Sequence, residues 1–161
     1  MPATEQIKIR RVEPSDIAGM VSARMDYLTE MQGERADAYQ TELRQRLMVF
    51  FTEAISQGSF FALQAEKEGE IVSYGGMILK KIPGDFNRST YLEGEILNMY
   101  TPPEHRRKGY SSTILKELLK EAKKLGVSKV ALHCSKAGEP LYRKHGFADP
   151  LYPYLELMID Q

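Results

Sequence analysis

The sequence has few of the residues that mark disulfide-linked or metal-binding proteins. It contains one cysteine, three histidines and no tryptophan in 161 residues. Cys134 cannot form an internal disulfide, so nothing favours an oxidising compartment. The histidines, His105, His133 and His145, do not have the spacing of metal ligands, and we expect no metal site.

Long apolar runs and an excess of one charge are also missing. The longest stretch without a charged residue, 54–65, is far shorter than the ~20 residues that span a bilayer. The N-terminal region contains Glu5, Lys8 and Arg10, and therefore no apolar segment of a signal peptide. Lys plus Arg and Asp plus Glu each number 22, so a general polyanion binder is disfavoured. We expect a cytoplasmic protein that binds neither membrane nor nucleic acid.

The length and the apolar pattern predict a single α/β domain over residues 1–161. Apolar residues at helical spacing predict helices at 17–31, 43–55, 114–125 and 139–144. Strands are expected around 7–9 and at 61–65 (half-buried), 71–79, 91–101, 127–133 and 155–159. Ser15 is a candidate helix N-cap, and 33–40 and 82–90 are expected to be loops. This order indicates a mixed central sheet flanked by helices.

A candidate anion-binding turn, 106–112, lies between a predicted strand and the most amphipathic predicted helix. Arg106, Arg107 and Lys108 supply positive charge, and Gly109 would let the backbone approach a ligand closely. The N-terminus of the following helix presents free N–H groups. The turn matches neither the P-loop nor the dinucleotide-binding glycine pattern. Taken alone, it indicates either a pyrophosphate held mainly by backbone or a solvated basic turn.

Three segments resemble the GNAT acetyltransferases. Residues 106–111, Arg-Arg-Lys-Gly-Tyr-Ser, resemble the family signature [Q/R]-x-x-G-x-[G/A], with Ser111 in the last place. Residues 140–147 resemble the family's LYEKLGF element, and residues 9–16 are similar to its first strand and turn. Ser135 stands where the family often has an asparagine, so we assign it no contact with pantetheine.

The resemblance implies that acetyl-CoA is the acetyl donor. Its pantetheine amides would pair with the strand end at Met99 and Thr101, as an added strand does. Its pyrophosphate would lie on backbone N–H groups from Arg107 to Ser112. The implied cofactor-binding residues are Met99, Thr101, Arg106, Arg107, Lys108, Gly109, Tyr110, Ser111 and Ser112.

Acetyl transfer to an amine needs a proton acceptor, a donor to the oxyanion and an acid for the departing thiolate. The resemblance places Tyr142 near the sulfur as the acid; a ring that only packs under the sheet is the alternative. It places the base at Glu95. Strand alternation puts Glu93 on the same side, so Glu93 or a water molecule remains an alternative base. Asn98 is expected to face the other way and to be structural.

We therefore expect direct transfer from acetyl-CoA to an amine of a small molecule or peptide. A catalytically silent acyl-CoA sensor is the alternative hypothesis, and net neutrality disfavours a nucleic-acid binder. Members of the family are often dimers, so a homodimer is an option that the sequence leaves open, as it does the acceptor's identity. Glu30, Glu34 and Asp37 are expected to form a solvated acidic loop, with attraction of a cationic amine substrate as the alternative.

Overall fold

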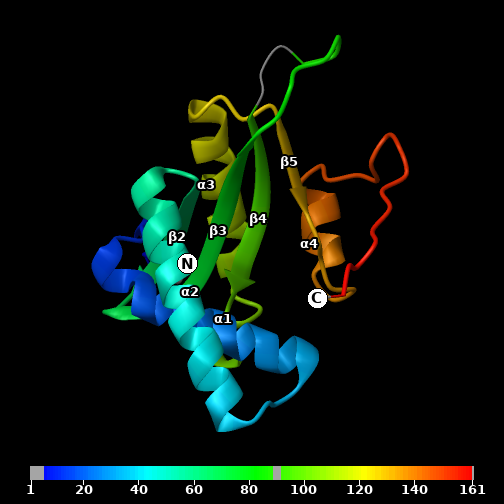
Figure 1. Ribbon diagram of the computed structural model, residues 1–161. Coiled ribbons are helices and arrows are strands. Elements are labelled where there is room, and N and C mark those ends of the chain that lie inside the picture. Colours follow the sequence, from blue (N-terminus) through cyan, green and yellow to red (C-terminus); the bar gives the residue numbers. More distant parts are fainter. Residues whose placement is uncertain (1–5, 89–91, 161) are drawn as a thin grey trace.

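Five strands form one sheet in the order β1-β2-β3-β4-β5 (Figure 1). The structure, a computed structural model, describes residues 6–88 and 92–160. The strands are β1 (Lys8–Arg11), β2 (Phe60–Lys67), β3 (Glu70–Lys81), β4 (Leu92–Tyr100) and β5 (Lys129–Leu132). The first four pair antiparallel, and β5 runs parallel to β4. The mixed α/β fold expected from the sequence is confirmed.

Helices cover both faces of this sheet (Figure 1). They are α1 (Ile17–Gln32), α2 (Asp37–Gln57), α3 (Tyr110–Lys124) and α4 (Glu139–Lys144), with short 3-10 turns η1 (Pro14–Asp16) and η2 (Pro103–His105). The helices α1 and α2 pack on one face, whereas α3 packs on the other, with Tyr142 of α4 joining its core. No helix in the described ranges is both long and apolar enough to cross a membrane.

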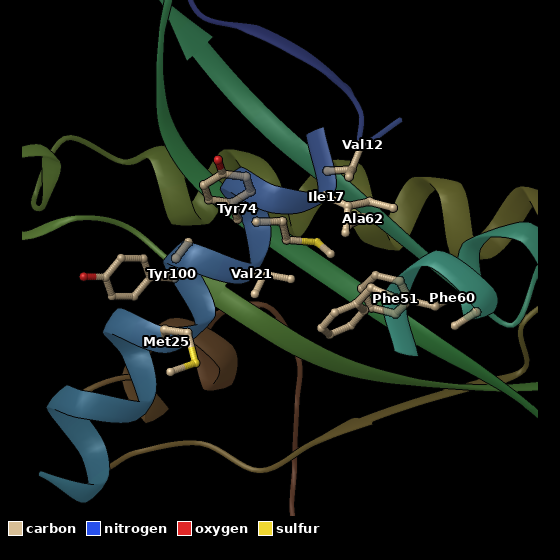
Figure 2. Packing of buried hydrophobic residues seen from close by; sticks show 12 residues of the cluster. Val12, Ile17, Val21, Met25, Phe51, Phe60, Ala62, Tyr74 and Tyr100 are labelled. Atoms are coloured by element: carbon tan, nitrogen blue, oxygen red, sulfur yellow. The ribbon is translucent and has the colours of Figure 1, made fainter. Parts of the chain in front are cut away.

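Two hydrophobic cores hold these layers together. Figure 2 shows the first, in which Ile17, Val21 and Met25 of α1 meet Phe51 of α2 and sheet residues such as Tyr74. The second core lies under α3. It is built from the fully buried side chains of Ile114, Leu115 and Leu118 against strand residues including Phe61, Leu63, Met77 and Ile96.

Burial on both faces corrects the expectation of a half-buried strand at 61–65. Phe60 and Ala62 enter the first core, and Phe61 and Leu63 enter the second. A strand that is covered by helices on both sides needs apolar residues at consecutive positions, so the alternation of residue types understated its burial.

Several expected boundaries differ from the structure. Ser15 is no N-cap, because it lies inside η1, where Glu13 and Asp16 form a capping box. The expected loop 33–40 is shorter, since α2 begins at Asp37 with an exposed polar first turn that carries no apolar periodicity. Ser89 and Thr90 of the expected loop, and Tyr91 at the expected start of β4, lie outside the described residues.

The expected last strand at 155–159 is wrong. The segment has no regular secondary structure and pairs with no described strand. Oε1 of Glu156 lies 3.7 Å from Nε2 of His133, which follows β5, and the ring of the preceding Tyr154 lies 6.1 Å from the His133 ring. The large apolar side chains at positions 151–159 are at least 70% exposed, and they are Leu151, Tyr152, Tyr154, Leu155, Leu157, Met158 and Ile159. High β-propensity does not make a strand where no sheet edge is paired with it.

Candidate active site

The candidate site begins where β4 and β5 part. Their pairing covers only Glu93–Ile96 of β4 and Lys129–Leu132 of β5. Beyond it, β4 carries one more residue than β3 between the pairs Tyr74–Tyr100 and Gly76–Leu97, and Asn98 has a φ of 59°. This β-bulge bends β4. Residues 97–100 have no partner on β5 within the described ranges, so an extended ligand can pair with this edge.

Met99 and Thr101, expected to meet the pantetheine arm, lie on or just after this open stretch. The Met99 side chain packs in the core under α3. The Thr101 hydroxyl lies 2.8 Å from the Ser111 hydroxyl and 2.8 Å from the buried Ser73 hydroxyl. These contacts join the end of β4 to the first turn of α3, so both side chains have structural partners while the strand edge stays open.

The turn before α3 has the backbone geometry of an anion site. Arg107 and Gly109 have φ values of 62° and 83°. The first helical hydrogen bond runs from Thr113 N to Gly109 O, so the N–H groups of residues 110–112 have no helical acceptor. Left-handed residues in such a turn direct neighbouring N–H groups toward one point, where the helix dipole adds positive potential. The arrangement fits a pyrophosphate.

Some side chains of this turn make structural contacts, and others are exposed. Arg106 donates from Nε to Thr101 O at 2.8 Å and from Nη2 to both oxygens of Glu30 at 2.8 and 2.9 Å. The Tyr110 side chain is buried in the core under α3, whereas Arg107 and Lys108 are exposed. Of these groups, Arg107 and Lys108 are therefore the cations available to a phosphate.

Glu30 is the partner that fixes Arg106, which corrects the expectation of a solvated acidic loop. It belongs to α1, and besides Arg106 it accepts a hydrogen bond of 3.0 Å from the Tyr100 hydroxyl. Burial raises the pKa of Tyr100 to about 12, and the Glu30 carboxylate adds to the shift. The contact braces the candidate phosphate turn against α1.

Tyr142 lies in α4 with a buried ring. The ring meets Phe147 edge-on at 5.7 Å between centroids, and its hydroxyl has no hydrogen-bond partner among the described residues. Burial raises the pKa of Tyr142 to about 12, with smaller contributions from Cys134 and Tyr27. The phenol therefore keeps its proton at neutral pH, as a proton donor must. The packed ring of the alternative interpretation is present as well.

Glu95 lies opposite Ala131 of β5, next to the last pair before the strands part. Its carboxylate forms an ion pair with Lys80, and its second oxygen is 3.9 Å from His133 Nε2. The register pairs Ile78 with Glu95 and Lys80 with Glu93, so the two glutamates share one side of β4 as expected.

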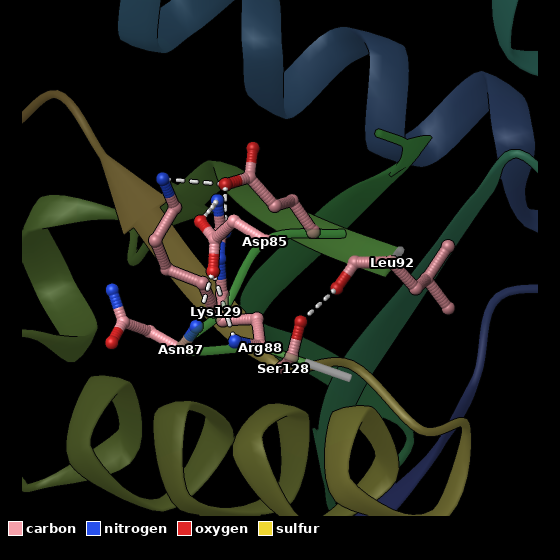
Figure 3. A network of polar contacts seen from close by, with 7 residues as sticks. Asp85, Asn87, Arg88, Leu92, Ser128 and Lys129 are labelled. Carbon is pink, nitrogen blue, oxygen red and sulfur yellow. Dashed lines mark hydrogen bonds and ion pairs between the residues drawn. The ribbon is translucent and has the colours of Figure 1, made fainter. Parts of the chain in front are cut away.

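Glu93 serves instead as a structural anchor. It accepts hydrogen bonds from Arg88 and Lys129. Desolvation raises its pKa, but these two cations outweigh that effect and hold the pKa of Glu93 below its usual range. Arg88 belongs to a turn in which Asp85 accepts from the backbone N–H of Asn87 and Arg88 (Figure 3). Glu93 thus ties this turn and β5 to β4.

Asn98 does not face the way that strand alternation predicted. Its Oδ1 accepts a hydrogen bond of 2.8 Å from Nη1 of Arg24 on α1. Ile78, the partner of Glu95, packs in the core under α1 and α2, so Asn98 and Glu95 share one face of the sheet. The extra residue of the bulge shifts the alternation by one position.

A model of the acetyltransferase (GNAT) family matches residues 18–147, most of the chain. This chain belongs to the GNAT family. Members of the family take the acetyl group from acetyl-CoA, which confirms the expected donor. No curated protein matches the sequence.

Solved structures of acetyltransferases share this GNAT fold. A predicted acetyltransferase from Clostridium acetobutylicum, solved with acetyl-CoA, is 28% identical, with a TM-score of 0.84 over 95% of this chain and 96% of that one. A GCN5-related N-acetyltransferase from Ralstonia eutropha is 20% identical, with a TM-score of 0.81 over 94% and 99%. Glucosamine-6-phosphate N-acetyltransferase from Arabidopsis thaliana is 24% identical, with a TM-score of 0.69 over 96% and 100%.

Sequence reasoning missed three contacts that shape this GNAT site. Glu30 holds Arg106, Arg24 pairs with Asn98, and His145 Nε2 lies 3.2 Å from the Ser112 hydroxyl. Each joins residues far apart in the chain, so no spacing pattern pointed to them. Ser135, at the family's asparagine position, accepts a hydrogen bond from Gly138 N and shapes the entry to α4.

One group of metal-ligand type exists in the described ranges. The ligand atoms of Glu70, Glu104 and His105 lie within 4.8 Å of one another, and His105 already pairs with Glu70 at 3.1 Å. Both glutamates are exposed, and this histidine–carboxylate contact is an ordinary surface pair. We assign it no metal.

Proposed function

We propose that this chain moves the acetyl group of acetyl-CoA to an amine by direct attack, without an acetyl-enzyme intermediate. One observation carries the proposal: the open edge of β4 leads directly into the turn whose helix N–H groups are free. An extended arm ending in a pyrophosphate matches these two features in sequence. Tyr142 packs under α3, and Ser112 in the first turn of α3 is hydrogen-bonded to His145, the residue that follows α4.

In the proposed reaction Glu95 removes a proton and Tyr142 donates one. Glu95, directly or through a water molecule, takes a proton from the acceptor ammonium so that the nitrogen lone pair is free. The nitrogen attacks the thioester carbonyl carbon, and a backbone N–H at the bulge of β4 stabilises the oxyanion. The carbon–sulfur bond then breaks, and Tyr142 donates its proton to the thiolate. The attacking nitrogen loses its second proton, and solvent returns a proton to the Tyr142 phenolate. The products are the N-acetylated amine and the free thiol of CoA.

A screen of amine acceptors, followed by release of the CoA thiol, tests this proposal. We expect acetyl-CoA to raise the melting temperature more than NAD or ATP does, because a ligand that binds only the native state stabilises it. We also expect amine-dependent thiol release from at least one acceptor class. Stabilisation by acetyl-CoA without thiol release from any amine would favour the catalytically silent sensor. Equal shifts from all three ligands would indicate a generic anion site.

A further inference from the structure

Arg24 of α1 is a largely buried cation without a carboxylate partner among the described residues. Its Nη1 donates to Asn98 Oδ1 at 2.8 Å, and its Nε is buried without any hydrogen-bond partner. Desolvation lowers the pKa of Arg24 from its ordinary value. A buried charge in a protein is normally paired with an opposite charge or a strong acceptor. The guanidinium of Arg24 therefore has capacity for an anion.

Asn98 adds a second unused donor at the same place. Its Nδ2 is buried and has no hydrogen-bond partner in the described part of the chain, and its backbone is held at a φ of 59° in the bulge of β4. Buried donors are nearly always paired, and backbone strain persists where the surrounding structure enforces it, often at functional sites. Arg24 already donates to Oδ1 of Asn98, but the remaining buried donors, Nε of Arg24 and Nδ2 of Asn98, lack an acceptor oxygen.

This pair borders the opening where acetyl transfer is proposed. Asn98 lies at the bulge, three residues after Glu95 and on the same face of the sheet. Tyr27, one helical turn after Arg24, contributes to the raised pKa of Tyr142. That contribution places this part of α1 within electrostatic reach of α4. Arg24 and Asn98 thus lie beside the bulge of β4, on the face of the sheet that carries Glu95.

We propose that Arg24 and Asn98 bind a carboxylate of the acceptor, so that the substrate is an amino acid or another small amine bearing a carboxylate. This inference rests on the proposed function and narrows it. A guanidinium and a neighbouring amide present planar N–H donors that suit the two oxygens of a carboxylate. Nη2 of Arg24 makes no hydrogen bond with another described residue and is not fully buried, so it is the donor that a ligand reaches first.

The test uses acceptors that differ only in their end group, such as glycine with glycinamide and β-alanine with β-alaninamide. We expect the wild type to favour the carboxylate member of a pair in kcat/KM. Arg24→Gln should lower kcat/KM for the carboxylates about 10- to 100-fold, because charge-assisted hydrogen bonds are lost, and leave the amides nearly unchanged. Arg44→Gln is the matched control: Arg44 is exposed and donates a hydrogen bond to Ser22, so its substitution should change neither class.

A binding measurement separates this inference from the proposed function. With CoA present, glycine or β-alanine should raise the melting temperature of the wild type, and the rise should be lost in Arg24→Gln. If no amine is acetylated but this rise is seen, the carboxylate site stands and the proposed catalysis fails. Asn98→Asp is the second variant; its own carboxylate would pair with Arg24, preserve the fold and exclude the ligand's carboxylate.

Three results would overturn the inference. An equal loss of kcat with both members of each pair would mean that Arg24 stabilises the oxyanion formed from the thioester and does not bind the acceptor's carboxylate. A preference for phosphoethanolamine over every carboxylate would replace the carboxylate with a phosphate. Absence of both binding and turnover with all carboxylates, in a protein that acetyl-CoA stabilises, would remove the site.

Discussion

The hydroxyl of Ser112, in the first turn of α3, lies 3.2 Å from Nε2 of His145, the residue that follows α4. Nδ1 of His145 is 2.8 Å from Leu141 O, and because a carbonyl can only accept, Nδ1 carries a proton. In the neutral ring, Nε2 therefore accepts from Ser112. The histidine connects the candidate phosphate turn to the helix that carries Tyr142.

The first prediction concerns this connection. His145→Phe keeps a ring of similar size and removes both hydrogen bonds, so α4 should be held less firmly against α3. We expect kcat to fall about 10-fold, because small displacements of a reacting group are costly. Acetyl-CoA should still stabilise the variant. Steady-state kinetics and thermal shifts measure the two effects, and an unchanged kcat would show that His145 does not position α4.

The second prediction concerns Gly109, whose φ is 83° and whose missing Cβ would meet no atom within 4 Å. Gly109→Val would strain the backbone by ~1–3 kcal/mol and cover the N–H groups of the turn. We expect weaker acetyl-CoA binding in a folded protein, measured by calorimetry. Gly126→Val is the control, because Gly126 has a φ of 79° and equally open surroundings at the other end of α3. Equal affinities for the two variants would place the pyrophosphate elsewhere.

The third prediction concerns Tyr142. Tyr142→Phe keeps the ring's packing and removes only the hydroxyl, so kcat should fall by roughly 10²-fold or more, as is typical of a lost general acid. Acetyl-CoA affinity should change little. Because the pKa of Tyr142 is about 12, deprotonation of this group should not limit the wild type below about pH 11. Tyr74→Phe, at another buried tyrosine whose pKa burial raises, should leave kcat unaltered.

The fourth prediction concerns Glu95. Glu95→Gln should lower kcat roughly 10²-fold at neutral pH, and part of the rate should return in alkaline buffer, where free amine is present without a base. Rates with saturating acceptor across the pH range measure this recovery. Glu93→Gln should lower stability, because Arg88 and Lys129 lose the carboxylate that joins them, yet keep the wild-type pH profile. Wild-type rates and profile in Glu95→Gln would assign proton removal to Glu93 or water.

The fifth prediction concerns the Arg10–Asp16 pair at the start of α1. The hydrogen bonds from Arg10, 2.6 and 2.9 Å long, lower the pKa of Asp16 to about 2 from 3.8. The lowered pKa stabilises the folded state above about pH 4, and this stabilisation is lost as the pH falls toward 2. Asp16→Asn should therefore cost about 1–2 kcal/mol at pH 7, after allowance for partial exposure.

Urea denaturation at several pH values measures this effect. The difference between wild type and Asp16→Asn should shrink steadily between pH 4 and pH 2. Glu66→Gln is a suitable comparison, because Glu66 lies 3.8 Å from the same Arg10 and both side chains are partly exposed. Its effect should stay within about 0.5 kcal/mol. A difference for Asp16→Asn that is constant with pH would mean that its charge does not stabilise the fold.

Local patterns in the sequence predicted most of the secondary structure. The helix at 114–125 was visible because apolar residues recur on one face of a well-solvated helix, and α3 occupies Tyr110–Lys124. The strand at 155–159 was also predicted from a local pattern of apolar residues, but it is absent. A strand depends on a neighbouring sheet edge, which lies elsewhere in the chain.

The sequence by itself determined the fold class, the family and the position of the candidate phosphate turn, because these depend on short segments whose residues act together locally. The tertiary structure decided which side chains are available for chemistry. In the folded chain Arg106 forms an ion pair with Glu30, and Glu93 forms ion pairs with Arg88 and Lys129. Asn98 accepts a hydrogen bond from Arg24. The physical reason is that charge pairing, burial and the side to which each residue of a bulged strand points depend on residues distant in sequence. These residues come together only in the folded chain.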